Sequence, residues 1–348
     1  MVVILALAVL IFGIKFAGKD SFFEDNFSKS QTRALKGLCA VYIIFHHLCT
    51  YLADFFPSFY AFKYLGFLMV GVFFFISGYG LMYGVANKEG YLNGFFKKRV
   101  TSVLIPFYII NLFSLAANYT TGSLTVKTAV LSLFGVYMWY VAAIVILYIG
   151  FYLSFKIFAL SKGILAVSVY TLLYILGMFV LHRFFNINSL GFWWYNSAIC
   201  FALGIWYCLL RKQINKLICN NYFKVLLLCV IMFVPLYVFI CNHFNDDMPS
   251  VLVCEILICI VFTVFIIAMT LKFKINNSVL NICGDLSLEL YLSHALFIYA
   301  LRSEIVVCNI KLYIQNNFLY FIAILLCTFV FSYIVNKAAG IIKKVLIN

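Results

Sequence analysis

Charged residues are scarce in this sequence: they make up 10% of its 348 residues, whereas 66% are hydrophobic. A soluble domain carries about 25% charged residues, so this composition excludes an ordinary soluble protein. No hydrophilic stretch is long enough to form a second, soluble domain. The chain is therefore expected to be one polytopic membrane protein, with membrane lipids as its first partners.

Acidic residues are also few, at 11 against 25 basic residues. In a soluble protein this excess would suggest nucleic acid, but here the bases lie in short loops between apolar segments, where they act as topology signals. We therefore expect no nucleic-acid partner. The 12 cysteines are scattered without a CxxC pair, and the five histidines lack HExxH-like spacing, so neither disulfides nor a metal site are expected.

Apolar segments of near the length that crosses a membrane, about 20 residues, recur eleven times. They predict an all-α helical bundle whose first helix is not a removable signal peptide, because it has no basic start or cleavage site. Residues 120–136 are expected to form an interfacial or re-entrant helix. The predicted spans are 1–18, 34–55, 60–85, 100–119, 137–158, 162–182, 193–210, 222–242, 251–271, 279–300 and 317–338.

Basic residues alternate along this arrangement of spans. Twenty of the 25 fall in the odd-numbered connections and the C-terminal tail, and five fall in the even-numbered connections. Lysine and arginine concentrate in cytoplasmic loops of membrane proteins. The pattern predicts a multi-pass plasma-membrane protein with its N-terminus outside and its C-terminus in the cytoplasm.

The second span carries Arg33 and Lys36 at its start and His46 and His47 deeper in. Lys36 and His47 are 11 positions apart, so they share a helix face within about 20° and lie about 16 Å apart along the axis. A charge in lipid costs about 2.5–3.5 kcal/mol, so this face is expected to look into a cavity. The side chain of His46 diverges by about 100° and is not expected to face the same cavity.

Asp54 follows His47 by seven residues and is expected to share its face and orient the imidazole. The alternative is that His47 makes an interhelical hydrogen bond with a structural purpose only. Two bases on the same stripe favour a functional role.

A second polar group lies at 286–294 and contains Glu289, Tyr291 and His294. An intramembrane carboxylate is typical of a functional site with a basic partner, and Arg33 or Lys36 is the natural candidate. Glu255 is the other intramembrane acid, and the sequence suggests no partner for it.

Three further patterns each have an ordinary structural interpretation. Gly80-x3-Gly84, after Ser77-Gly78, predicts a helix-packing face. The basic stretch at 95–99 is typical of a topology signal or lipid contact, but it could equally hold the phosphates of an anionic donor. Aromatic residues at 139–140 and 193–195 are typical of interfacial belts, and Asn196 and Ser197 beside them could touch a sugar.

Taken in order, these segments resemble acyltransferase family 3, a family of integral-membrane acyltransferases. The matching stretches are TRALKGLCAVYIIFHHL with Lys36-x10-His47, GVFFFISGYGL at 71–81, FFKKRVTSVLIPFY at 95–108, MWYVAAIVILY at 138–148, WWYNSAICFALG at 193–204 and LSLELYLSHALFI at 286–298. The family core has ten membrane helices, so the helix over 1–18 is expected to be an addition to an acyltransferase domain over 31–340. One departure is Ser102-Val103, where many members carry a second base before the proline.

The resemblance implies transfer of an acyl group, usually acetyl, from cytosolic acyl-CoA to a hydroxyl of a cell-surface polysaccharide or lipid-linked glycan. It implies acetyl-CoA as a donor substrate and no permanently bound cofactor. We expect His47 to be the general base or acyl relay, a reaction that needs no metal. The expected site residues are Lys36, His47 and Glu289 in catalysis, Arg33, Lys97, Lys98 and Arg99 at the donor, and Ser77, Trp139, Tyr140, Asn196, Tyr291 and His294 at the acceptor.

Two other classes of protein are compatible with parts of the sequence. A transporter or exporter of a small anion or surface glycan would use the same intramembrane polar residues as a binding site. A receptor or scaffold would explain the spans but leave Lys36, His47 and Glu289 without a role.

Overall fold

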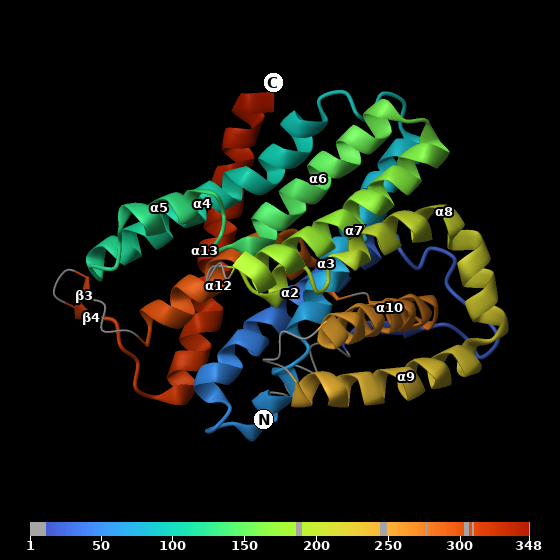
Figure 1. Ribbon diagram of the computed structural model, residues 1–348. Coiled ribbons are helices and arrows are strands. Elements are labelled where there is room, and N and C mark those ends of the chain that lie inside the picture. Colours follow the sequence, from blue (N-terminus) through green and yellow to red (C-terminus); the bar gives the residue numbers. More distant parts are fainter. Residues whose placement is uncertain are drawn as a thin grey trace.

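The computed structural model describes residues 12–185, 190–243, 249–275, 277–302, 306–307 and 310–347. In this part of the chain, twelve helices form one bundle with two short β-ribbons (Figure 1). The helices are α2 (Lys29–Leu52), α3 (Gly66–Asn87), α4 (Thr101–Thr120), α5 (Val126–Leu133), α6 (Trp139–Ile157), α7 (Leu160–Phe185), α8 (Ile199–Asn220), α9 (Tyr222–Asn242), α10 (Pro249–Lys272), α11 (Ser278–Asp285), α12 (Ser287–Ala300) and α13 (Asn317–Ile347).

The all-α membrane bundle predicted from composition is confirmed, but the count of eleven spans is not. Among the described residues, nine helices are long and apolar enough to cross a membrane. Residues 1–11 of the predicted first span lie outside the described residues, so that helix stays a prediction. Residues Ile14–Phe16 at its end form strand β1, which pairs antiparallel with β2 (Phe273–Ile275). The second ribbon joins β3 (Val306–Val307) to β4 (Ile310–Lys311).

The predicted span over 279–300 is divided into two helices, α11 and α12, at Leu286. Its longer part, α12, has 14 residues and reaches about 21 Å, short of the roughly 30 Å hydrocarbon core. The break follows a close contact between α11 and α2. A side chain at Gly284 would meet the Arg33 carbonyl oxygen at 1.9 Å, and one at Gly37 would meet the Leu280 carbonyl oxygen at 2.0 Å.

This close contact decides where the polar residues of α12 lie. With α11 held against the first turns of α2, the chain turns at Leu286, and α12 then continues beside the rest of α2. The face of α2 that carries Lys36 and His47 therefore meets the helix that carries Glu289 and His294.

A second pair of glycines joins α3 to α8. A side chain at Gly78 would lie 2.1 Å from the Phe201 carbonyl oxygen, and one at Gly204 would lie 2.1 Å from that of Phe75. The predicted packing face at Gly80 and Gly84 is wrong, because Gly80 has nothing within 4 Å and Gly84 packs on the Tyr91 ring. Which glycines of α3 form a close contact depends on the helix that packs against it, and the sequence of α3 alone does not reveal that helix.

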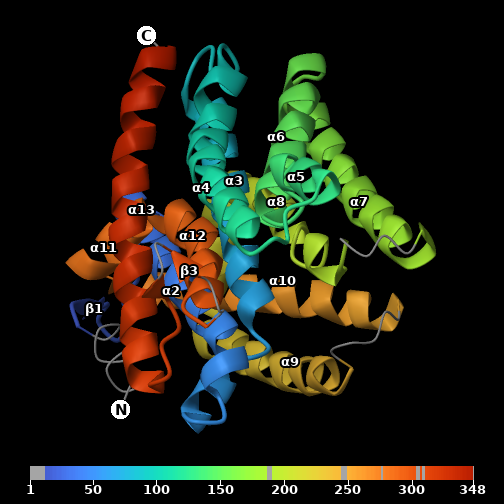
Figure 2. The same cartoon turned by 90° about the vertical axis from the view of Figure 1, so that its left-hand side faces the viewer.

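The remaining helices surround this centre. Helices α9 and α10 pack side by side as a hairpin, and α13 runs along one side of the bundle beside α4 and α12 (Figures 1 and 2). The predicted interfacial helix within 120–136 is present as α5, which begins with a capping box formed by Thr125 and Thr128. Short helical turns η1 (Pro57–Phe62), η2 (Phe96–Val100) and η3 (Phe192–Trp194) precede α3, α4 and α8.

Several basic residues near β1 hold the N-terminal segment onto the bundle. The Lys272 ammonium donates to the carbonyl oxygens of Gly18, Lys19 and Ser21 at 2.8–2.9 Å. The Arg211 guanidinium donates to the Asn26 side chain at 2.9 Å. Lys272 and Arg211 therefore have a structural role in holding this segment.

Candidate functional site

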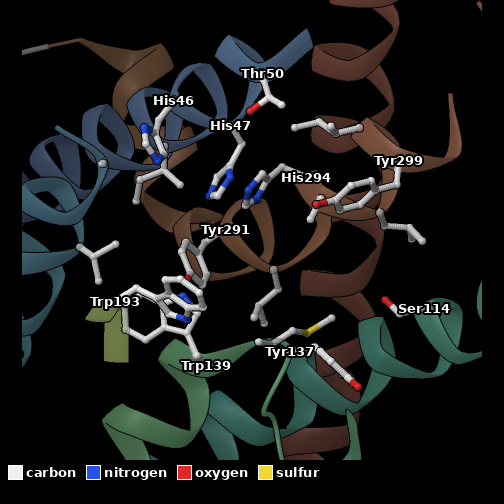
Figure 3. A pocket seen from close by; sticks show the side chains of 18 of the residues that line it. His46, His47, Thr50, Ser114, Tyr137, Trp139, Trp193, Tyr291, His294 and Tyr299 are labelled. Atoms are coloured by element: carbon white, nitrogen blue, oxygen red, sulfur yellow. The ribbon is translucent and has the colours of Figure 1, made fainter. Parts of the chain in front are cut away.

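A cavity of about 850 Å³ lies beside His47, between α2, α4, α6 and α12 (Figure 3). Its walls come from the end of α2, the start of α3, the end of α4, the start of α6, the turn η3 and most of α12. The volume is in the range of small-molecule binding sites. Of the two residues predicted to face a cavity, His47 lines this one and Lys36 does not.

Two imidazoles meet in this cavity. The rings of His47, from α2, and His294, from α12, have centroids 4.9 Å apart and lie side by side in Figure 3. The Nδ1–H of His294 donates to the Leu290 carbonyl oxygen at 3.2 Å. A neutral imidazole that donates through Nδ1 carries its lone pair on Nε2.

His294 is only 4% exposed, and its Nε2 has no hydrogen-bond partner in the described part of the chain. The side chain of His47, in contrast, is exposed to the cavity. A buried acceptor without a partner is costly in free energy and calls for an explanation. The pair therefore combines an accessible imidazole with a fixed lone pair beside it.

Aromatic side chains make up much of the opposite wall. Trp139 and Trp193 lie across the cavity from the histidines, and Tyr291 lies below them (Figure 3). Asn196 also contributes to the lining. No Lys, Arg, Asp or Glu lines the cavity among the described residues, so its ligand meets rings, amides and hydroxyls.

A row of hydroxyl groups continues from the histidines into the bundle. The Tyr291 ring meets that of His294 at 5.9 Å and that of Tyr140 at 5.3 Å. The hydroxyl of Ser77 in turn interacts with the phenols of Tyr140 and Tyr148. Ser77 and Tyr140 do not line the cavity and are connected to it through the contact of Tyr140 with Tyr291.

Charged residues gather where α11 meets α2. Arg33 forms an ion pair with Asp285 at 3.1 Å. Lys36 is close enough to interact electrostatically with Asp285 and Glu289, while Glu289 itself accepts a hydrogen bond from Asn336 at 3.0 Å. The predicted basic partner of Glu289 is thus Lys36, at longer range than an ion pair, and not Arg33.

The basic turn η2 lies at the start of α4, with Lys97, Lys98 and Arg99 all exposed. Arg99 lies over the Tyr91 ring, 5.4 Å from its centroid. Burial raises the pKa of the Tyr91 hydroxyl, and the charge of Arg99 opposes that shift. This turn presents three positive charges to the surroundings of the bundle.

A fourth base reaches this end from α13, where Lys343 donates a hydrogen bond to the Ser102 hydroxyl. Lys343 and Arg99 are also close enough to interact electrostatically. Ser102 stands where many members of the family that the sequence resembles carry a second base before the proline. A positive charge is therefore present there, supplied by another helix.

Comparison with known protein families shows which family the chain belongs to. A family model described as an acyltransferase domain matches residues 32–337. The chain belongs to acyltransferase family 3. It is therefore a membrane-bound acyltransferase, and the match contains the histidine pair, the cavity wall and the basic turn. No curated protein and no solved structure matches the chain.

Two expectations about the histidines of this acyltransferase are wrong. His46 and His47 both line the cavity, with ring centroids 5.0 Å apart, because the cavity extends around the end of α2. His46 is held at its wall by a 2.9 Å hydrogen bond from Nδ1 to the Phe62 carbonyl oxygen. Asp54 does not orient His47, because α2 ends at Leu52; its carboxylate accepts from Tyr60 at 2.9 Å.

The candidate site also has neighbours that the sequence did not single out. Asn336 and Lys343 lie on α13; Asn336 falls in the predicted span 317–338, and Lys343 falls in the predicted cytoplasmic tail. Tyr148 lies on α6 and lacks a distinguishing pattern. A polar residue in an apolar segment is the one signal that would have drawn attention to Asn336.

Metal ligands are not grouped anywhere in the part of the chain that the structure describes. No set of three or more His, Cys, Asp or Glu side chains is arranged to hold an ion there.

Proposed function

We propose that this family 3 protein transfers an acetyl group from cytosolic acetyl-CoA to a hydroxyl of a neutral glycan, part of a cell-surface polysaccharide or a lipid-linked sugar. The observation that carries the proposal is the pairing of His47 with His294 in an aromatic cavity whose described lining residues include no Lys, Arg, Asp or Glu. Aromatic walls and neutral polar groups suit sugar rings, whereas an anion would require a positive charge.

The alternation of basic residues supports opposite sides for donor and acceptor. The basic turn η2 and the end of α13 belong to the base-rich side, which is the cytoplasmic side by the positive-inside rule. The cavity is built mainly from helix ends on the base-poor side, at Thr50, Asn118 and Trp139. Acetyl-CoA would thus bind at the cytoplasmic end and the glycan would enter from outside.

The reaction needs one base at the acceptor hydroxyl. We assign this role to His47, which removes the proton as the hydroxyl oxygen attacks the thioester carbonyl carbon. The new C–O ester bond forms, the C–S bond breaks, and the CoA thiolate takes the proton. We place the approach of the thioester beside Tyr140 and Tyr291, which connect Ser77 to the histidines.

His294 is suited to orienting His47. Its Nδ1–H is held by the Leu290 carbonyl, so its Nε2 can accept an N–H from His47. That hydrogen bond would leave the other nitrogen of His47 as the acceptor for the substrate proton. A base oriented by a third group is the general arrangement for activating a weak nucleophile.

At the donor end, Lys97, Lys98, Arg99 and Lys343 would bind the phosphates of CoA through charge-assisted hydrogen bonds. Lys36 and Glu289 lie between this end and the histidines and would position the donor. The rival function, transport of an anion, is disfavoured by the cavity, since none of its described lining residues is charged.

Replacing Lys343 by glutamine is expected to raise the KM for acetyl-CoA by about 3- to 10-fold, with kcat little changed. The variant loses one charge–phosphate contact with the donor. Because Lys343 is partly exposed, that contact contributes less binding free energy than a buried one would. Steady-state kinetics of the purified protein would measure this. Lys344→Gln is the matched control, because Lys344 is exposed and is expected to leave KM unchanged; equal effects of both would contradict a specific donor contact.

The proposal as a whole is tested by incubating the protein, purified in nanodiscs, with acetyl-CoA and maltotriose as a neutral glycan probe. We expect release of free CoA thiol together with acetylated maltotriose, detected by mass spectrometry. Intact acetyl-CoA after long incubation would contradict the proposal.

A further inference from the structure

Glu255 is a carboxylate inside the bundle, on α10, and the chemistry above does not use it. It is 3% exposed. It forms no ion pair among the residues that the structure describes, and its Oε1 accepts a hydrogen bond from Nδ2 of Asn196 at 3.1 Å. A buried acid is expensive in a membrane, and two apolar residues would join α10 to this segment at lower cost.

Asn196 connects this acid to the cavity. It is fully buried and is one of the residues that line the cavity. Its backbone N–H donates to the Phe192 carbonyl at 3.1 Å, and its backbone carbonyl accepts from the Cys259 thiol at 3.7 Å. Its side-chain Oδ1 has no hydrogen-bond partner among the described residues. Every other polar group of Asn196 has a partner within the fold, which leaves Oδ1 as the one unused acceptor.

The contact with Glu255 fixes which end of the Asn196 amide remains for a ligand. An amide side chain can present either its NH₂ or its oxygen, and a carboxylate oxygen pairs with the NH₂. With the NH₂ directed to Glu255, the oxygen of Asn196 is left for a ligand. A sugar hydroxyl is a donor that would complete it, whereas a ligand with acceptors only would leave it unpaired.

We propose that Glu255 is a positioning residue for the glycan acceptor: through the Asn196 amide it holds an oxygen at the cavity wall that accepts a hydrogen bond from a sugar hydroxyl. This inference rests on the proposed function for the identity of the acceptor, but it concerns binding and not acyl transfer. It gives the buried acid a role and makes the site selective for hydroxyl donors.

Binding of maltotriose to the nanodisc-embedded protein, followed by tryptophan fluorescence, tests this without requiring turnover. Trp139 and Trp193 line the same cavity and would report an occupant. We expect the Kd to rise about 5- to 100-fold in Glu255→Leu, Asn196→Leu and the double variant alike, because all three lose one hydrogen-bonding unit. Glu255→Gln, which keeps an acceptor oxygen for the amide, is expected to stay within about 3-fold of the wild type.

Thr263→Val on the same helix is the matched control, because Thr263 contacts Cys200 and its own helix and does not line the cavity. Thiol release from acetyl-CoA without sugar should be unchanged in this control. Three results would overturn the proposal. They are no binding of maltotriose by the wild type, unchanged binding in Asn196→Leu, and additive losses of affinity in the double variant. If Glu255→Leu lost both thiol release and thermal stability while Asn196→Leu still bound maltotriose, Glu255 would have a structural role only. Sugar binding without any thiol release would instead contradict the proposed function and leave this inference standing.

Discussion

Replacing His47 by glutamine is expected to lower the rate of acetyl transfer by about 10²- to 10⁴-fold, the usual contribution of a general base. The expected cause is loss of the accessible imidazole beside His294, at a position where the side chain meets the cavity more than the protein. The variant should therefore fold normally, with an unchanged elution profile and melting temperature. The measurement is kcat for thiol release from acetyl-CoA in the presence of maltotriose.

His182→Gln is the matched control for this variant. His182 interacts with the Tyr195 hydroxyl at 3.0 Å and does not line the cavity. It is expected to retain activity within about 3-fold. His294→Gln is expected to fall between the two, because it removes an orienting group and leaves the base in place. Wild-type activity in His47→Gln would remove the chemical basis of the proposed function.

Replacing Gly204 by valine is expected to destabilise the bundle by at least about 3 kcal/mol, at or beyond the upper end of ordinary overpacking. The reason is that a Cβ at this position would lie 2.1 Å from the Phe75 carbonyl oxygen and 2.8 Å from the Tyr79 nitrogen, both backbone atoms. Because neither atom can move without its helix, α3 and α8 must separate. Thermal unfolding of the purified protein, or its loss during purification, would show the effect.

Gly80→Val provides the contrast, since nothing lies within 4 Å of a Cβ there. It should not destabilise the bundle, because valine has a higher helix propensity than glycine by a few tenths of a kcal/mol. If both variants unfolded alike, helix flexibility and not the contact of α3 with α8 would be responsible.

Much of the fold follows from the sequence because hydrocarbon thickness fixes the length of a span. In the described part of the chain, nine predicted spans correspond to long apolar helices, although α8 and α13 extend nine or ten residues beyond the predicted ends at 210 and 338. The division at Leu286 was missed because an apolar segment of adequate length does not reveal that part of it will pack across a neighbour. The decisive contact, Gly284 on the backbone of Arg33, depends on residues far apart in the chain.

The candidate site was predictable only in part for the same reason. The spacing of Lys36 and His47 placed both on one face, and the structure brings that face to Glu289 and His294. The partners themselves were not predictable: Glu289 accepts from Asn336, and Asp54 leaves the helix before it can reach His47. The partner of Glu255 is Asn196, which the sequence had suggested only as a sugar contact.

The most direct test of the central claim uses proteoliposomes with maltotriose trapped inside and acetyl-CoA added outside. Transfer across the bundle predicts free CoA thiol outside and acetylated maltotriose inside, both lost in His47→Gln. Accumulation of intact acetyl-CoA inside, without thiol release, would show transport instead. Acetylation that occurs only when donor and sugar are on the same side would contradict the opposite placement of the two sites.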